Sequence, residues 1–105
     1  MQKTPKIRSK KHLKFIANLP CVICRKTDVQ AAHVRSGNGA GMGLKSGDDC
    51  VVPLCVKHHT KQHSMNERTF WSYYGGIENA TRLANALFNV TGNNIDALRL
   101  IAGFT

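Results

Sequence analysis

The chain has 105 residues and a formal net charge of +9, from 15 Lys and Arg against 6 Asp and Glu. Its length permits one domain with a modest core, and its 42% hydrophobic content argues against wholesale disorder. No signal-peptide core or transmembrane run is evident, so we expect a cytoplasmic protein with reduced thiols and no membrane partner. The charge favours a polyanionic partner, with nucleic acid the first candidate.

Basic residues gather at the N-terminal end, where no acid precedes Asp28. We expect residues 1–12 to form a basic arm and residues 13–105 to form the folded domain with C-terminal helices. A solvated tail is the alternative interpretation of the arm. The basic residues that we expect to contact DNA are Lys10, Lys11, Lys14 and Arg35.

The first predicted elements are a helix, a turn and a strand. Leu13, Phe15, Ile16 and Leu19 can share an inward helical face before Pro20. Residues 21–24 then form a tight turn, and residues 29–34 form a strand that carries His33. Residues 36–47 are glycine-rich and predict a loop.

A second strand is predicted over residues 49–54, and helices follow Cys55. Ser64 and Glu67 have capping-box spacing, which predicts a helix through Tyr74 that ends at Gly75 and Gly76. Two more helical faces are separated by residues 92–94. These faces comprise Leu83, Leu87 and Phe88, and then Ile95, Leu98 and Ile101.

All four cysteines and four of the five histidines lie between Cys21 and His63. The pairs Cys21-x2-Cys24 and Cys55-x2-His58 have the spacing of a zinc knuckle, and together they predict a tetrahedral structural zinc site. Buried thiols and a surface histidine are the alternative interpretation. Cys50 is left over, either as a packed thiol, which we favour, or as a substitute ligand.

A second group of histidines can support chemistry. His59 and His63 share one helical face, about 100 degrees away from His58, and can hold a divalent ion with open coordination positions. His33 can deprotonate water, with Arg35 beside it to stabilise phosphate charge. A satisfied core histidine is an equally good interpretation of His33.

The order CVIC, AAH, DDCVVPLC, HH and a further His, followed by an FW segment, resembles the HNH endonucleases of the ββα-metal type. The likeness is greatest to phage and prophage members related to the RecA-dependent recombination-enhancement nuclease, and it covers about Leu13 to Gly76. It implies an α+β fold in which a small ββα-metal core with a zinc knuckle is flanked by helices.

The resemblance also implies roles for individual residues. His33 becomes the general base, and His59 and His63 become ligands of a catalytic divalent cation (Mg²⁺, Mn²⁺ or Zn²⁺). Cys21, Cys24, Cys55 and His58 become the knuckle. Two family positions differ, because Ala32 replaces a frequent metal ligand and Cys50 replaces the central Asn.

Asp48 is the substitute that we expect for the missing polar group, either as a metal ligand or as the residue that orients His33. Asp49 is its rival. The expected function is metal-dependent hydrolysis of DNA phosphodiester bonds in phage or prophage DNA processing, with His33, Asp48 and His59 as catalytic residues. One alternative is a zinc-stabilised DNA-binding module without catalysis. Another is an interaction domain for a recombination protein.

Overall fold

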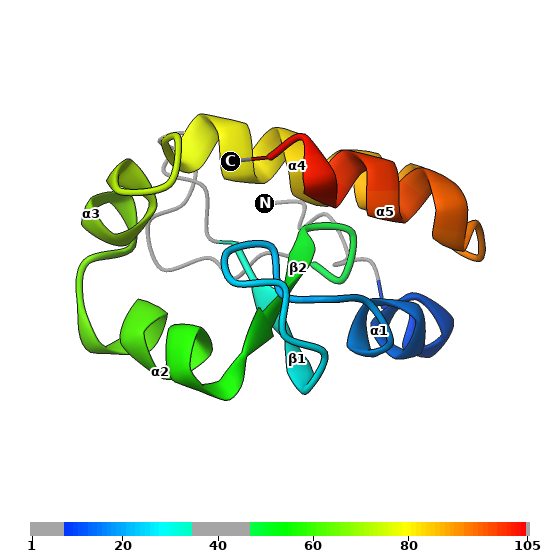
Figure 1. Ribbon diagram of the computed structural model, residues 1–105, viewed down its shortest axis with the longest axis horizontal. Helices are drawn as coiled ribbons and strands as arrows, with labels where there is room; N and C mark the ends of the chain where they lie inside the picture. Colours follow the sequence, from blue (N-terminus) through cyan, green and yellow to red (C-terminus); the bar gives the residue numbers. More distant parts are fainter. Residues whose placement is uncertain (1–7, 35–46, 105) are drawn as a thin grey trace, which may run out of the picture.

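The computed structural model describes residues 8–34 and 47–104, and it has an α+β architecture (Figure 1). The sheet has two antiparallel strands. The described elements in chain order are α1 (Lys10–Ala17), β1 (Val29–His33), β2 (Val51–Cys55), α2 (Val56–Ser64), α3 (Glu67–Ser72), α4 (Ile77–Asn89) and α5 (Asn94–Ala102). The two predicted strands are therefore confirmed, with small differences in their bounds.

The hairpin lies at the centre of the fold, and every residue of β2 is buried. Helices α1, α2 and α4 all pack against β2. Pro53 is compatible with this strand because each strand of a two-stranded sheet has a free edge, where the missing N–H costs no ladder bond. The register places Val29 opposite Cys55 and His33 opposite Val51.

Helix α1 begins at Lys10, earlier than the helix expected from Leu13. Ser9 is its N-cap, and the Ser9 side chain accepts a hydrogen bond from the His12 N–H. Ile16 and Leu19 are buried as expected, and Leu13 and Phe15 are partly buried. Lys10 and Lys11, which the sequence placed in the arm, thus belong to the first turn of a packed helix.

His12 is fully buried, which the sequence did not indicate. Its Nδ1 lies 2.7 Å from Thr91 Oγ1, and the Thr91 hydroxyl donates to the Phe88 carbonyl. Nδ1 must therefore carry the proton that the hydroxyl oxygen accepts, which leaves Nε2 unprotonated. Nε2 is buried without a hydrogen-bond partner among the described residues. Burial accordingly lowers the pKa of His12, against the opposing charges of Asp48 and Asp49.

We expect His12→Leu to flatten the acid side of the stability profile. A histidine with a lowered pKa in the fold contributes stability that is complete above its unfolded pKa, near 6.5, and is lost as the pH falls through the folded pKa. One such proton changes the unfolding free energy by at most about 1.4 kcal/mol per pH unit. Urea denaturation between pH 8 and pH 5 measures this slope. Equal slopes in wild type and variant would contradict the assignment.

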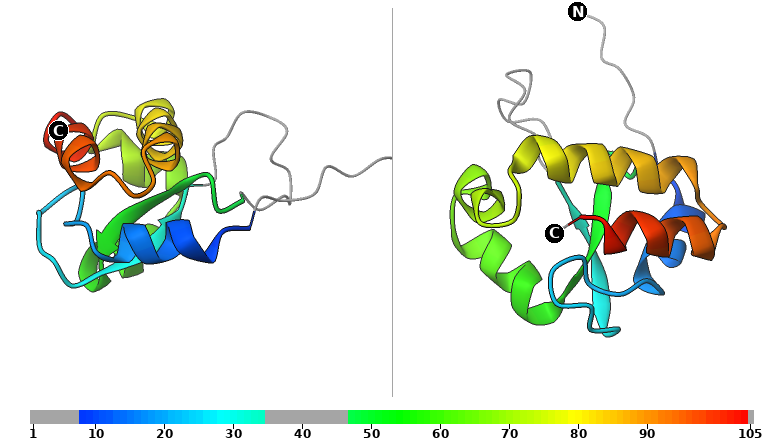
Figure 2. Two further views of the ribbon diagram at one scale, coloured as in Figure 1. Left: turned by 90° about the vertical axis from the view of Figure 1, so that its right-hand side faces the viewer. Right: turned by 45° about the horizontal axis from the view of Figure 1, so that its top comes forward.

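Helices α4 and α5 lie side by side and antiparallel across the hairpin, and α3 connects α2 to α4 (Figures 1 and 2). The N-cap of α3 is Asn66, whose side chain accepts from Thr69 N–H, so the predicted capping box at Ser64 is wrong. Ser64 instead ends α2. Gly75 and Gly76 have φ of 97° and 96° and form the predicted break before α4.

The inward face of α5 differs from the predicted one. Ile101 is buried as expected, together with Ala97. Ile95 and Leu98 are 65% and 46% exposed, because the packed stripe follows Ala97 rather than the larger neighbouring side chains. Within the described residues, every helix is too short or too polar to cross a membrane.

Candidate metal centre and neighbouring histidines

The first cysteine pair lies on a tight loop between α1 and β1. Cys21 N–H donates to the Lys26 carbonyl at 2.7 Å, and Arg25 N–H donates to the Cys21 carbonyl at 2.9 Å. Arg25 has a positive φ of 66°, which closes the turn. Val22 N–H donates to the Pro53 carbonyl, which fastens the loop to β2. The second pair is at the junction of β2 and α2, where Cys55 is the N-cap residue.

These two segments bring Cys21, Cys24, Cys55 and His58 together, with their four ligand atoms within 4.8 Å of one another. Cys24 Sγ lies 3.6 Å from Cys55 Sγ, and His58 Nδ1 lies 3.2 Å from Cys55 Sγ and 3.8 Å from Cys21 Sγ. In a tetrahedral site with ordinary metal–ligand bonds, neighbouring sulfurs lie about 3.8 Å apart and sulfur and nitrogen about 3.6 Å apart. The cluster can therefore hold a metal ion.

The surroundings of the cluster favour the ligating form of Cys21 and His58 but not of Cys24. Burial opposes ionisation of Cys21, but backbone N–H groups of Cys24, Cys55 and Ile23 donate to its sulfur, and the net effect lowers its pKa. Burial raises the pKa of Cys24. Burial also lowers the pKa of His58, with a further contribution from nearby lysines, so its imidazole is neutral at pH 7 and can ligate.

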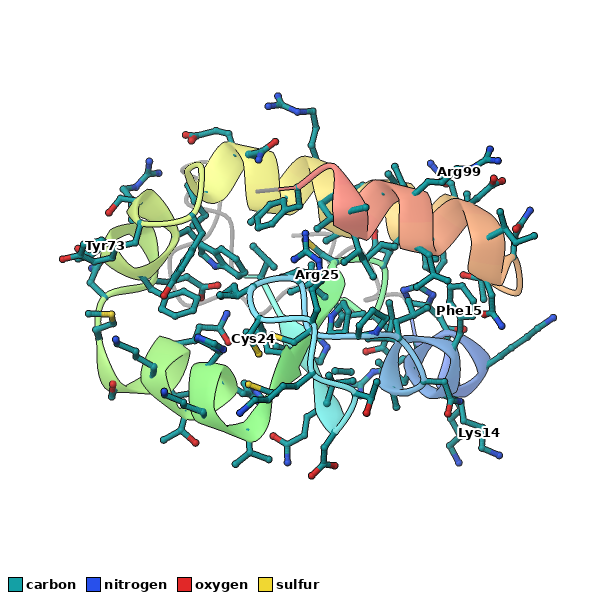
Figure 3. All side chains as sticks on the ribbon, viewed as in Figure 1. Lys14, Phe15, Cys24, Arg25, Tyr73 and Arg99 are labelled. Atoms are coloured by element: carbon teal, nitrogen blue, oxygen red, sulfur yellow. The ribbon has the colours of Figure 1, made fainter. Side chains whose placement is uncertain are left out.

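Arg25 connects this loop to the end of α5. Its guanidinium donates to the Val22 carbonyl within the loop and to the Ile101 carbonyl of α5, the latter at 3.0 Å. Figure 3 shows Arg25 between the loop and the end of α5. A metal ion in the cluster would therefore stabilise the loop and, through Arg25, the packing of α5 against it.

His33 is at the end of β1, where its Nε2 lies 3.1 Å from Asp48 Oδ1. Its side chain is 41% exposed, whereas that of Asp48 is 11% exposed. His33 is thus an exposed histidine oriented by a carboxylate, and the interpretation as a core histidine is wrong. With Nε2–H donating to Asp48, the Nδ1 lone pair is left to accept a proton.

Asp48 uses both of its oxygens. Oδ2 accepts from the Ser9 N–H at 2.8 Å, at the start of α1. Burial raises the pKa of Asp48, but the Ser9 N–H, His33 and the charge of Arg8 more than offset it, so the pKa falls below its usual value. The carboxylate is consequently ionised at neutral pH and holds the His33 ring.

His59 and His63 converge on the exposed side of α2. Their Nε2 atoms lie 3.1 Å apart, close to the spacing of about 3.3 Å expected for two imidazoles on one tetrahedral ion. Gln30 on β1 contributes an amide oxygen 2.7 Å from His59 Nδ1. His59 then carries its proton on Nδ1, and its Nε2 lone pair faces His63.

The charge state of His59 also suits ligation. Burial lowers its pKa first, and the nearby imidazoles of His63 and His33 lower it further. His33 is therefore close enough to His59 for their charges to interact. The His33–Asp48 pair and the His59–His63 pair do not form a single compact cluster. In residues 8–34 and 47–104, the only group of three or more candidate ligands whose ligand atoms all lie within 4.8 Å of one another is Cys21, Cys24, Cys55 and His58.

The positions that depart from the expected pattern are packed in the core. Ala32 is fully buried. Cys50 is buried, and its thiol donates to the Val34 carbonyl at 3.4 Å, which confirms the packed interpretation. Arg35 lies outside the described residues.

The three predicted lysines are all exposed on α1. Lys10 and Lys11 directly follow Ser9, whose N–H binds Asp48. Lys14 is one turn further, and Figure 3 shows it pointing away from the body of the molecule. A basic surface thus begins beside the His33–Asp48 pair.

A hairpin followed directly by a helix, with a Cys₃His cluster at their junction, defines a small α+β protein with a candidate metal centre. The chain belongs to the family described as protein of unknown function DUF968, which matches residues 1–90. It is 34% identical over 65 residues to uncharacterized protein YdfU of Escherichia coli (strain K12), an alignment that covers 59% of this chain and 19% of the relative. The chain spans about a fifth of the length of that curated relative. No solved structure matches.

Proposed function

We propose that the protein is a metal-dependent endonuclease that hydrolyses DNA phosphodiester bonds, built on a ββα-metal (HNH) core with a zinc knuckle. The observation that carries the proposal is that the His33–Asp48 pair and the His59–His63 pair lie on adjoining elements, because Gln62 of α2 donates to the His33 carbonyl at 3.1 Å. His33 is oriented by Asp48 at 3.1 Å, and His59 and His63 direct their Nε2 atoms toward each other at 3.1 Å.

Two cations have separate duties in this proposal. Zinc suits the knuckle because a site with three sulfurs and one imidazole nitrogen is typical of structural zinc. His59 and His63 would hold the catalytic divalent cation, which would supply positive charge to offset the negative charge that develops during phosphodiester hydrolysis. Asp48 has both oxygens engaged by His33 and Ser9, so it acts as the orienting residue rather than as a metal ligand.

The chain's own residues supply the remaining chemistry. His33 removes a proton from the attacking water through Nδ1, while the Asp48 carboxylate stabilises the imidazolium that forms. Lys10, Lys11 and Lys14 contact the DNA backbone, together with Arg35. Phosphate contacts of this kind give salt-sensitive and largely sequence-independent affinity. The proposed DNA substrate and the absence of disulfides among the described cysteines support a role in phage or prophage DNA processing in the bacterial cytoplasm.

Incubation of supercoiled plasmid with purified protein and Mg²⁺ or Mn²⁺ tests the proposal. Nicked or linear product that chelation abolishes is the expected result. A shift of the DNA in a gel without cleavage would instead support a zinc-stabilised DNA-binding module, which Ala32 and Cys50 favour because neither contributes a polar ligand. Neither cleavage nor a shift would support an interaction domain.

Gln30→Ala should weaken binding of the catalytic ion by about 10- to 100-fold, because loss of the group that orients a ligating histidine has effects of this size. Gln30→Glu keeps an oxygen acceptor for His59 Nδ1–H and should bind at least as tightly as wild type. Calorimetric titration of the zinc-loaded protein with Mn²⁺ measures both variants. Equal affinities for wild type and Gln30→Ala would remove Gln30 from the site.

A further inference from the structure

Gln62 lies between His59 and His63 in the sequence of α2, but it belongs to the buried side of the helix and is only 4% exposed. Its Nε2 donates to the backbone carbonyl of His33 at 3.1 Å and to Glu67 Oε2 at 2.8 Å. Both amide hydrogens therefore have acceptors. One of these acceptors is the peptide group of the residue that we propose as general base.

The His33 carbonyl needs such a donor because of its position in the hairpin. Val34 N–H donates to the Cys50 carbonyl at 2.9 Å, so Val34 and Cys50 form a hydrogen-bonded pair. Hydrogen-bonded and non-bonded pairs alternate along an antiparallel ladder, and His33 opposite Val51 is therefore a non-bonded pair. Its carbonyl points away from β2, where the sheet has no third strand. Gln62 Nε2 donates the hydrogen bond that a backbone N–H of a third strand would otherwise supply.

The contact continues into the core. Glu67 Oε2, which accepts from Gln62, also accepts from the indole N–H of Trp71 at 3.0 Å. Trp71 is fully buried and stacks edge-on against Phe70 and Phe104. A continuous series of hydrogen bonds thus links the end of β1 to α2 and then to the packed interior of α3.

The orientation of the Gln62 amide is fixed by these neighbours. A rotated amide would direct Oε1 at a carbonyl oxygen and a carboxylate oxygen, which are both acceptors. In the observed orientation Oε1 is buried and has no partner among the described residues. An unsatisfied buried carbonyl costs free energy. The two hydrogen bonds that Nε2 donates to His33 and Glu67 offset this cost and determine the orientation of the amide.

We propose that Gln62 is a positioning residue for His33, which it holds through the peptide carbonyl while Asp48 holds the ring. Two restraints on opposite ends of one residue define where Nδ1 points. The inference rests on the proposed function for its catalytic consequence, because His33 is then the general base. The restraint itself is independent of any metal ion.

Gln62→Met tests the proposal, since Met has a similar size and flexibility but no donor. We expect kcat for plasmid nicking with Mg²⁺ to fall about 10- to 100-fold, the size of effect that small misplacements of catalytic groups produce, with KM nearly unchanged. The indole N–H resonance of Trp71, the single Trp of the chain, should move, as should the carbonyl ¹³C resonance of His33. Thr60→Met, at an exposed position of α2, is the matched control and should change none of these quantities.

A pair of variants at Glu67 tests whether the Glu67 acceptor helps to hold Gln62 in place. Glu67→Gln keeps an oxygen that can accept from both Gln62 and Trp71, and it should retain kcat. Glu67→Leu removes that oxygen and should resemble Gln62→Met. A folded Gln62→Met protein with wild-type kcat would overturn the proposal. If wild type itself does not cleave DNA, the proposed function fails, and the His33 carbonyl resonance then decides: movement in Gln62→Met supports the restraint, and an unchanged resonance refutes it.

Discussion

Cys24→Ser is expected to release the knuckle metal and to remove most of the stability of the domain. Structural zinc contributes about 10–16 kcal/mol of binding free energy in zinc-finger peptides at pH 7, whereas small domains are stable by only about 5–15 kcal/mol. Loss of one ligand should therefore lower the thermal transition by at least about 15 °C. Chelator-treated wild type should melt like the variant.

Zinc content by mass spectrometry and melting by circular dichroism measure this result. Cys24 is the best position because it is partly exposed, so Ser leaves no buried cavity. Cys50→Ala is the control, since Cys50 is buried outside the metal cluster. This control should keep one zinc ion and lose about 1–2 kcal/mol of unfolding free energy. A full equivalent of zinc and an unchanged transition in Cys24→Ser would exclude the knuckle from the fold.

The loss should extend beyond the loop, because the loop that carries Cys21 and Cys24 is hydrogen-bonded to distant elements. Val22 N–H of the loop donates to the Pro53 carbonyl of β2, and the Arg25 guanidinium donates to the Ile101 carbonyl of α5. A loop that no longer holds Cys21 and Cys24 together also loses the geometry of these bonds. We therefore expect α5 to exchange its amide hydrogens faster in the metal-free protein.

Features that depend on short spacings were predictable from the sequence. The motifs that begin at Cys21 and Cys55 each place two candidate ligands within one turn of chain. The four ligands therefore meet as soon as the end of β2 packs beside the loop that carries Cys21. Likewise, His59 and His63 are four residues apart and must share a face of any helix. The break at Gly75 and Gly76 was predictable because positive φ angles favour glycine.

Features that depend on distant contacts were not predictable. Nothing near His12 in the sequence indicates that Thr91 and Phe88 enclose it. Gln30 and Gln62 are neutral amides without a motif, and their roles arise only when β1 and α2 come together. Ile95 and Leu98 fit a helical apolar pattern, but α5 packs through Ala97 and Ile101. In each case tertiary packing outweighs the local pattern.

Tertiary contacts decide between Asp48 and Asp49. Adjacent residues in a turn point in different directions, so the preference for Asp48 over the rival Asp49 stayed a prediction until their contacts were seen. The structure gives Asp48 a bond to His33 and a second bond to Ser9 at the start of α1. The helix that carries Lys10, Lys11 and Lys14 is thereby fixed beside His33, which links the basic surface to the proposed reaction centre.

His33→Ala should reduce the rate of plasmid nicking by about 100- to 10,000-fold, which is the usual contribution of a general base. The side chain is 41% exposed, so its removal leaves no closed cavity, and zinc content should stay at the wild-type value. The melting temperature should fall by only a few degrees, because Asp48 loses one hydrogen-bond partner. DNA affinity should also be retained because the lysines of α1 are untouched. Nicking assays, gel shifts and melting curves on one preparation separate these effects.

The neighbouring acids provide the matched comparison for His33. Asp48→Ala removes the carboxylate that holds the ring and should slow nicking by at least about 10-fold, with a loss of about 1–3 kcal/mol because the Ser9 N–H loses its acceptor. Asp49→Ala removes the same charge one residue away and should cleave nearly as fast as wild type. Equal losses in the two variants would mean that only the local negative charge matters. Undiminished cleavage by His33→Ala would require a different base.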